Sequence, residues 1–181
     1  MTTTRERLEA VLDEMRGVFA RMDADAVPHL AGSIIAARRI FLYGAGRNGL
    51  VLQAFAMRLA HLGLDADFVG QLSAPPAASG DLFLVALALG ALPTGDALSA
   101  SARAAGAKVA VVSARPQKVV GADLLLHLPA QTMADPMTSV LALGSPFELA
   151  LSLLCDLTVA ELMLRLDRSN EDLAARHTNL L

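Results

Sequence analysis

Residues 39–49 read Arg39-Ile-Phe-Leu-Tyr-Gly-Ala-Gly-Arg-Asn-Gly49 and place a glycine-rich turn directly after a short apolar run. A helical pattern of apolar residues follows, from about Asn48 to His61, and Gly63 ends it. Glycines permit the tight turn that a strand needs when it leads straight into a helix. This stretch therefore predicts one β-strand–turn–helix unit of an α/β fold.

The same alternation of apolar runs and helical patterns continues along the chain. It predicts four further strands, at residues 66–69, 81–86, 108–112 and 123–127, and helices at 94–105, 145–167 and 169–177. Two helices precede them, at 5–26 and from Pro28 to about residue 37. Continuously apolar strands separated by helices indicate a parallel sheet that is covered on both faces. We therefore expect a three-layer α/β/α sandwich with a five-stranded, flavodoxin-like parallel sheet, N-terminal helices and a long C-terminal helix.

Length and charge limit the classes of protein that the chain can belong to. Its 181 residues predict a single domain spanning 1–181. The formal net charge of −3 argues against a nucleic-acid partner, because phosphate neutralisation needs clustered Lys and Arg. The lone Cys155 excludes an internal disulfide and a cysteine-based zinc site. The N-terminus has no apolar signal stretch, so a cytoplasmic location is expected.

The high apolar content needs an explanation other than a membrane. Hydrophobic residues make up 54% of the chain, against a usual share of about 45–50%. The most apolar segment, residues 146–166, contains Glu148, Asp156, Glu161 and Arg165, and such charges are costly inside a bilayer. We therefore predict a buried helix there, no membrane span, and a homodimer or homotetramer that covers the remaining apolar surface.

The turn Gly44-Ala-Gly-Arg-Asn-Gly49 matches the pattern G-x-G-x-x-G, which brings a phosphate close to the N-terminus of a helix. A dinucleotide site also needs an acidic residue at the end of the second strand. Gln71 stands there, while Asp65 and Asp67 come at or before the start of that strand. The pattern therefore favours an anionic ligand other than a dinucleotide. A nucleotide-dependent oxidoreductase is the least supported hypothesis for the function.

The segment Tyr43-Gly-Ala-Gly-Arg-Asn-Gly49, followed by Ala54-Phe-Ala-Met-Arg-Leu-Ala-His-Leu-Gly63, resembles the first motif of sugar isomerase (SIS) domains. More narrowly, the chain resembles the 6-phospho-3-hexuloisomerases. The resemblance continues in order through Phe68-Val-Gly70, Gly106–Val112, Phe147-Glu-Leu149, Val159–Met163 and Asp172–His177. It implies an SIS fold that binds a sugar phosphate at the carboxyl ends of the strands. It also implies isomerisation of 3-hexulose 6-phosphate to fructose 6-phosphate through an enediol, with no metal or organic cofactor.

One motif of the family is lost. Where the family has S-G-S-G-E-T after the third strand, this chain has Leu87-Ala-Leu-Gly-Ala-Leu92, and leucine cannot donate a hydrogen bond to phosphate. Two functions therefore stay open. The chain is either a phosphosugar isomerase with a rebuilt phosphate site or a non-catalytic SIS domain that binds a sugar phosphate or another metabolite.

The resemblance and the strand-end loops together give a set of candidate residues. Glu148 and His177 are the candidates for proton transfer, with His177 on a C-terminal element that in this family reaches a neighbouring subunit. Each has a structural alternative: Glu148 completes a capping box with Ser145 at the start of the long helix, and His177 is a cation at a helix end.

Thr94 is a candidate cap for its helix. The candidate substrate-binding residues are Gly44, Gly46, Arg47, Asn48, Gln71, Ser73, Gly90, Thr94 and Ser113. The irregular segment 129–144 is a candidate functional loop.

Overall fold

The computed structural model describes residues 2–179, apart from the side chain of Lys118, and its centre is a five-stranded sheet. All four pairs of neighbouring strands are parallel, in the order β2-β1-β3-β4-β5. The strands are β1 (Ile40–Gly44), β2 (Ala66–Phe68), β3 (Leu82–Ala86), β4 (Lys108–Ser113) and β5 (Leu124–His127). The predicted five-stranded parallel sheet is thus confirmed.

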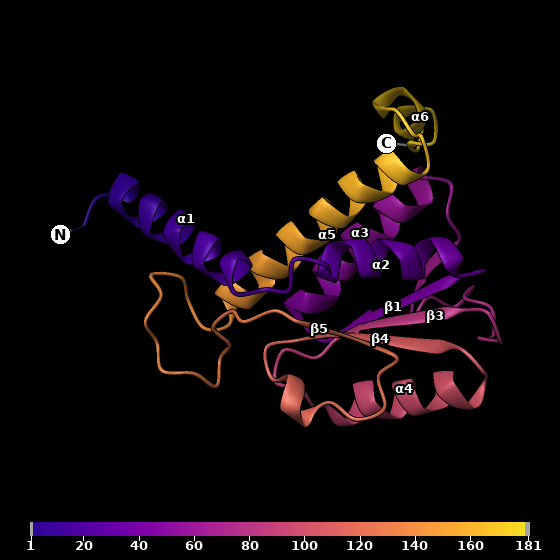
Figure 1. The fold of residues 1–181 in the computed structure, drawn as a ribbon, viewed down its shortest axis with the longest axis horizontal. Coiled ribbons are helices and arrows are strands. Elements are labelled where there is room, and N and C mark those ends of the chain that lie inside the picture. Colours follow the sequence, from indigo (N-terminus) through magenta and orange to yellow (C-terminus); the bar gives the residue numbers. More distant parts are fainter. Residues whose placement is uncertain (1, 180–181) are drawn as a thin grey trace.

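Helices cover both faces of the sheet, as the apolar strands predict. They are α1 (Thr4–Ala20), α2 (Ala26–Ala36), α3 (Arg47–His61), α4 (Pro93–Ala104), α5 (Ser145–Arg165) and α6 (Asn170–Ala175), with a short 3-10 turn, η1, at Pro116–Lys118. Figure 1 shows α2, α3 and α5 on one side of the sheet and α4 on the other. The three-layer α/β/α arrangement is therefore confirmed.

The side chains of the three central strands, β1, β3 and β4, alternate between two separate cores. Leu42 and Leu84 belong to the core shared with α2, α3 and α5, whereas Phe41, Phe83 and Val85 belong to the core under α4. Successive residues of a strand point to opposite faces, so both sets must be apolar in a sheet covered twice. The helix at 146–166 is buried along one side as expected, and no helix among the described residues has the length and apolarity to cross a membrane.

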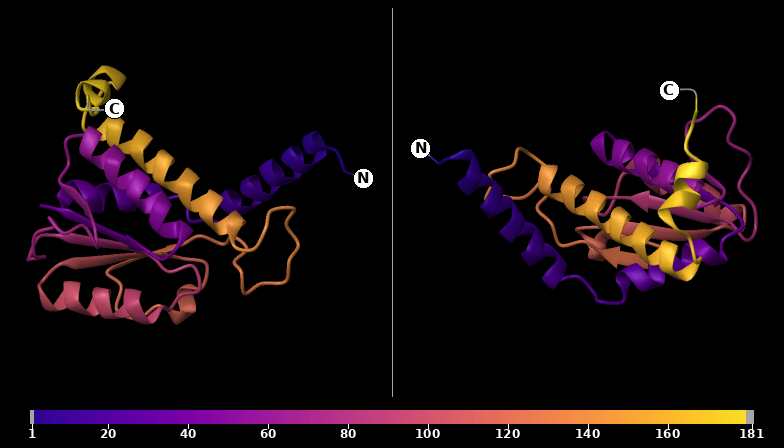
Figure 2. Two further views of the ribbon diagram at one scale, coloured as in Figure 1. Left: turned by 180° about the vertical axis from the view of Figure 1, so that it is seen from behind. Right: turned by 90° about the horizontal axis from the view of Figure 1, so that it is seen from above.

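The N-terminal helices differ from the prediction. The expected helix 5–26 ends at Ala20, and α2 already begins at Ala26, two residues before Pro28. The chain turns between them because the Asp23 carboxylate accepts a hydrogen bond from the Asp25 N–H, which competes with helical hydrogen bonding. The turn lets α1 extend away from the rest of the fold (Figures 1 and 2).

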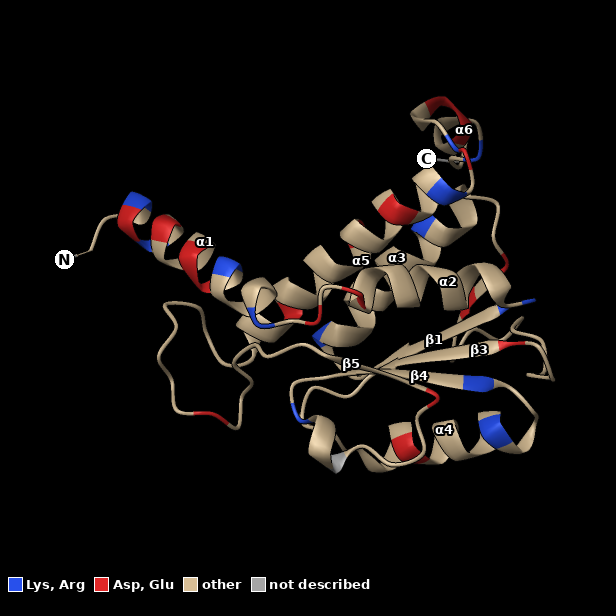
Figure 3. Ribbon diagram, in the orientation of Figure 1, with Lys and Arg blue, Asp and Glu red and all other residues tan. Residues whose placement is uncertain are grey.

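Five of the fifteen exposed large apolar side chains of the described residues lie on two helices, α1 and α5. Leu8 and Leu12 of α1 and Leu153, Leu157 and Leu164 of α5 are exposed to solvent. Figure 3 shows that α1 also carries charges of both signs along its length. Exposed apolar side chains of this kind are what the homo-oligomer expected from the sequence would bury.

Candidate active site

The glycine turn joins the end of β1 closely to the start of α3. Gly46 has a φ of +56°, a conformation that favours glycine, and it precedes the helix directly. A Cβ atom on Gly49 would lie 2.4 Å from the carbonyl oxygen of Gly44, so only glycine fits there. The turn therefore directs the N-terminal end of α3, with its free N–H groups and positive potential, toward the carboxyl edge of the sheet.

A cavity of about 270 Å³ lies at this edge, between the loops that follow β1 and β3. The loop before α5 and the first turn of that helix close it. Most of its lining is apolar, and the only charged or polar side chains are those of Asn48, Thr132 and Glu148. The lining residues are Ala45, Asn48, Ala86–Leu89, Ala91, Leu92, Thr132, Met133, Leu143, Gly144, Phe147 and Glu148. This is where parallel α/β sheets usually bind their ligands.

Glu148 and Arg47 form the charged pair of the site. The Arg47 Nε donates to the Glu148 Oε2 at 2.5 Å, across 101 residues of sequence. The Glu148 side chain is 18% exposed, whereas that of Arg47 is 71% exposed. A half-buried carboxylate that lines the cavity is thus paired with an arginine whose side chain is largely exposed to solvent.

The capping alternative for Glu148 is wrong. Helix α5 begins at Ser145 with Gly144 as its N-cap, so Ser145 is already helical and its side chain caps nothing. Glu148 consequently stands one position too far along the helix for a capping box and contacts Arg47 instead. The same correction applies to Thr94, which lies inside the first turn of α4 while Leu92 occupies the N-cap position.

The loop 87–92 keeps a turn that exposes main-chain donors, although it lacks the hydroxyl groups. Gly90 has a φ of +81°, and its N–H donates to the carbonyl of Leu87. Among the described residues, none accepts a hydrogen bond from the N–H groups of Ala88, Leu89 or Ala91. The Leu92 N–H, by contrast, donates to the Asp96 carboxylate at 3.2 Å, so the chain's own negative charge sits at the start of α4.

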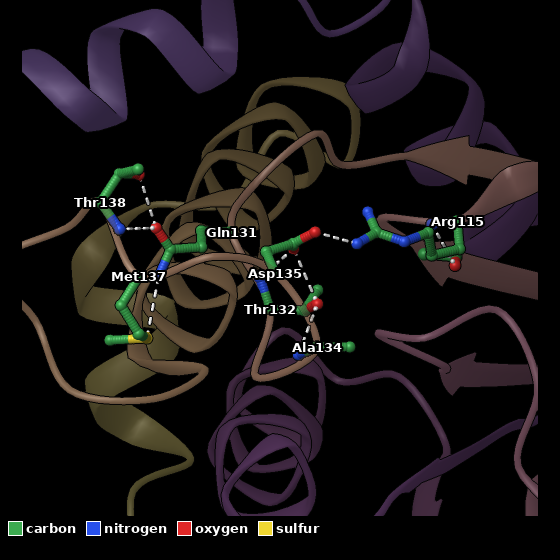
Figure 4. Close-up of polar contacts among 8 residues, drawn as sticks. Arg115, Gln131, Thr132, Ala134, Asp135, Met137 and Thr138 are labelled. Atoms are coloured by element: carbon green, nitrogen blue, oxygen red, sulfur yellow. Dashed lines mark hydrogen bonds and ion pairs between the residues drawn. The ribbon is translucent and has the colours of Figure 1, made fainter.

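Residues 131–139 form a braced loop, and its residues Thr132 and Met133 line the cavity. Figure 4 shows the polar contacts that brace it. The Asp135 carboxylate accepts hydrogen bonds from the Thr132 N–H at 2.7 Å and the Thr132 hydroxyl at 2.8 Å, and it pairs with Arg115. Hydrogen bonding from Thr132, and then the pairing with Arg115, hold the pKa of Asp135 below its usual range. The Gln131 Oε1 accepts from the Thr138 N–H and hydroxyl and from the Ser139 N–H. These contacts fix Thr132 and Met133 against the cavity.

Sequence reasoning named this segment only as a functional loop and missed the lining residues Thr132, Met133 and Leu143. The available signal was Thr132-x-x-Asp135, a spacing at which a carboxylate folds back onto the threonine N–H and hydroxyl.

Of the nine candidate binding residues, Asn48 alone lines the cavity. Gly44, Gly46 and Arg47 belong to the adjoining glycine turn, Gly90 to the loop 87–92 and Thr94 to α4, whereas the remaining three lie apart. Gln71 and Ser73 are exposed beyond β2 at the sheet edge. Gln71 lines a shallower hollow of about 510 Å³ whose walls carry no titratable side chain. Ser113 is fully buried at the end of β4, and its hydroxyl accepts a hydrogen bond from the Arg115 N–H at 2.9 Å. Ser113 thus supports the segment that holds Arg115.

His177 is not brought to Glu148 within one chain. Helix α3 begins beside the cavity and ends at His61, whose ring lies 5.1 Å from that of His177. Fourteen residue steps along α3 correspond to about 21 Å. The two candidates for proton transfer therefore lie at opposite ends of α3.

The described residues form no metal-binding cluster, and the thiol of Cys155 is inert. Within residues 2–179, no group of three or more His, Cys, Asp or Glu side chains is arranged to hold a metal ion. Burial raises the pKa of the Cys155 thiol well above its usual range, so Cys155 is not a nucleophile.

The chain is similar to several curated proteins over nearly its full length. It is 31% identical to the 3-hexulose-6-phosphate isomerase of Bacillus subtilis, covering 98% of each chain. It is 33% identical to the 3-hexulose-6-phosphate isomerase of Mycobacterium gastri, covering 96% of this chain and 89% of that protein. No sequence profile of a known protein family matches the chain.

Solved structures extend the similarity to three dimensions. A protein from Methanococcus jannaschii, whose crystal structure led to an inferred function of 3-hexulose-6-phosphate isomerase, superposes with a TM-score of 0.82 at 28% identity. The two chains cover 97% and 99% of each other. The NanR protein of Vibrio vulnificus, solved in complex with ManNAc-6P, has a TM-score of 0.70 at 16% identity, a likeness of fold alone. That match covers 94% of this chain and 64% of the NanR chain.

Proposed function

The chain belongs to the family of 3-hexulose-6-phosphate isomerases, and we propose that it interconverts 3-hexulose 6-phosphate and fructose 6-phosphate at the cavity beside Glu148. The observation that carries the proposal is the half-buried Glu148 carboxylate, which lines this cavity at the carboxyl edge of the sheet and is held by Arg47. The proposal includes a cytoplasmic reaction that needs no cofactor and no nucleic-acid partner.

Glu148 is the general base of the proposed reaction. Its carboxylate removes the proton from C2 of the 3-ketose, and the electron pair forms a C2–C3 double bond while the C3 carbonyl oxygen takes up a proton. The resulting 2,3-enediol then loses the proton of its C2 hydroxyl and receives one at C3, which leaves a C2 carbonyl. Atoms and electrons balance without an oxidant, and a carboxylate near the cavity wall suits both proton transfers.

Arg47 and Asn48 supply the polar contacts around the base. The Arg47 guanidinium is largely exposed and reaches Glu148 through Nε, so its other N–H groups are available to an oxygen of the substrate. The Asn48 Oδ1 is buried and has no hydrogen-bond partner among the described residues, and a sugar hydroxyl would satisfy it.

The phosphate group has main-chain donors in this proposal. The N–H groups of Ala88, Leu89 and Ala91 and those at the start of α3 take the place of the missing serine and threonine hydroxyls. The carboxylate of Asp96 opposes an anion at the start of α4, so we expect weaker phosphate binding than a hydroxyl-lined loop gives.

The acid partner of Glu148 comes from a second copy of the chain in our proposal. Within one protomer, α3 separates His177 from the cavity. The helix is about 21 Å long, with the cavity at its start and His177 beside its last residue, His61. A homodimer or homotetramer that buries the exposed leucines of α1 and α5 would bring His177 of one copy to the cavity of another.

The leucine-rich wall favours a second candidate, a non-catalytic SIS domain that binds a sugar phosphate or another metabolite. Leu87, Leu89, Leu92 and Met133 give the cavity an apolar lining that a phosphosugar does not need. Binding of a ligand without proton transfer distinguishes this candidate from the isomerase.

Deuterium exchange tests the proposed reaction directly. The protein is incubated with fructose 6-phosphate in D₂O, and the fructose 6-phosphate recovered from the mixture is examined by NMR. A 2,3-enediol places deuterium at C3, whereas a 1,2-enediol places it at C1. We expect deuterium at C3 with the natural chain and a loss of about 100-fold or more with Glu148→Gln. Absence of exchange alongside binding of fructose 6-phosphate would favour the non-catalytic domain.

A further inference from the structure

His61 is a buried imidazole that the proposed reaction does not use. It closes α3, is 6% exposed, and makes no hydrogen bond with any described residue. Its contact is the ring of His177, with the two ring centroids 5.1 Å apart and the rings inclined by 38°. The His61 ring nitrogens are not among the fully buried side-chain atoms that lack a hydrogen-bond partner, so the contact with His177 is one of ring packing.

His61 lies where the C-terminal segment docks onto the body of the fold. Leu173 of α6 is buried, and the capping box of Ser169 and Asp172 starts that helix. The remainder of the segment is exposed, His177 included. The ring of His61 is therefore one of few contacts that determine where the imidazole of His177 lies.

The charged groups around this contact are mostly cations. On α3, Arg58 acts on His61, and from the C-terminal segment His177 does so too. Arg176 packs against the turn at Gly63, where its Nε would lie 3.3 Å from a Cβ atom, and its Nη1 donates to the Asp172 carbonyl. On α5, the neighbouring helix, Arg165 is paired with Glu161. The Asp172 carboxylate is engaged by Ser169 at the start of α6.

We propose that His61 is a positioning residue for catalysis, because its buried ring fixes the ring of His177 and so holds the C-terminal segment in the orientation that delivers His177 to the cavity of a neighbouring copy. This inference rests on the proposed function, in which His177 is the acid partner of Glu148. It assigns to the C-terminal end of α3 a role in the reaction at the other end of the same helix.

A lower pH should weaken the contact between the rings of His61 and His177. Burial, and then the charges of His177 and Arg58, lower the pKa of His61 from its usual value. Protonation is therefore unfavourable while the segment is docked, and the docked state loses stability as the pH falls below about 6.5, the value in the unfolded chain. Above that pH the contact contributes fully to the stability of the docked segment.

Three variants of the full-length protein test the inference. His61→Ala removes the ring, His61→Phe keeps an uncharged ring, and His29→Ala is a control at an exposed histidine on α2. We expect His61→Ala to lower kcat by about 10- to 100-fold with little change in KM, because a displacement of about 1 Å has effects of that size. His61→Phe should restore most of kcat and extend activity to lower pH, and His29→Ala should resemble the natural chain.

A second measurement needs no turnover. Amide hydrogen exchange over residues 169–179 is expressed as protection factors, which correct for the slower intrinsic exchange at lower pH. The protection factors should be lower at pH 5.5 than at pH 7.5 in the natural chain, low at both in His61→Ala, and high at both in His61→Phe. If the natural chain does not convert the substrate, the proposed function fails and this exchange still decides whether His61 docks the segment. Natural kcat and natural exchange in His61→Ala would overturn the inference, as would a pH profile of His61→Phe identical to that of the natural chain.

Discussion

Replacing Asp135 by alanine tests whether the braced loop holds the wall of the cavity in place. The carboxylate accepts two hydrogen bonds from Thr132, at 2.7 and 2.8 Å, and pairs with Arg115. Hydrogen bonds to a charged group contribute about 1.5–3 kcal/mol each, but the Asp135 side chain is 25% exposed and water screens part of this. We expect Asp135→Ala to lower the free energy of unfolding by about 2–3 kcal/mol, which corresponds to about 4–12 °C in Tm.

The matched control is Asp65→Ala. Asp65 also pairs with an arginine, Arg39, at 2.9 Å, but its side chain is 64% exposed and it braces no loop. Its loss should cost about 0.5 kcal/mol or less in urea unfolding. Because Thr132 lines the cavity, Asp135→Ala should also raise KM several-fold, whereas Asp65→Ala should leave KM unchanged.

The contribution of Asp135 to the free energy of unfolding should depend on pH, in a direction that follows from its pKa. The pKa of Asp135 is lowered in the folded protein, first by hydrogen bonding from Thr132 and then by Arg115. Its stabilisation is therefore complete above the unfolded value of about 3.9 and declines as the pH falls through the lower folded value. The difference in stability between the natural chain and Asp135→Ala should stay constant from pH 5 to 7 and shrink below pH 4. An equal loss in Asp135→Ala and Asp65→Ala at pH 7 would refute the account of the braced loop.

Four other substitutions have defined outcomes. Leu92 has the extended conformation of an N-cap, with φ −153° and ψ 121°, so Leu92→Thr should add a donor for phosphate and lower the KM for the phosphosugar about 10-fold in steady-state kinetics. Gly49→Ala places its Cβ 2.4 Å from the Gly44 carbonyl and should cost about 3 kcal/mol or more in urea unfolding, whereas Gly46→Ala, which meets no atom within 4 Å, should cost about 1 kcal/mol from backbone strain. Arg47→Met removes the partner of Glu148 and should weaken binding of fructose 6-phosphate about 10-fold or more in calorimetric titration, and unchanged affinity would exclude Arg47 from the site.

The sheet and the position of the cavity could be predicted from the sequence because both depend on local patterns. Continuous apolar runs such as Leu82–Ala86 identify buried parallel strands, and the conformational freedom of the glycines at 44–49 identifies the turn onto α3. Since parallel strands end at the same edge, the loops that follow β1 and β3 had to meet.

The details of the site depend on contacts between distant segments, which local patterns do not encode. Arg47 and Glu148 are 101 residues apart, and their pairing follows from the packing of α3 against α5. Glu148 was also a candidate capping residue, and the choice turned on whether α5 begins at Ser145 or one residue later. The fold of the loop at Thr132 and Asp135 likewise depends on Arg115.

The most direct test of the central claim is the rate at which the natural chain and Glu148→Gln form fructose 6-phosphate from 3-hexulose 6-phosphate, measured together with the affinity of each for fructose 6-phosphate. The account predicts turnover by the natural chain, and a loss of about 100-fold or more in kcat in Glu148→Gln with affinity retained. Equal turnover by both proteins, or binding without turnover by the natural chain, would contradict it.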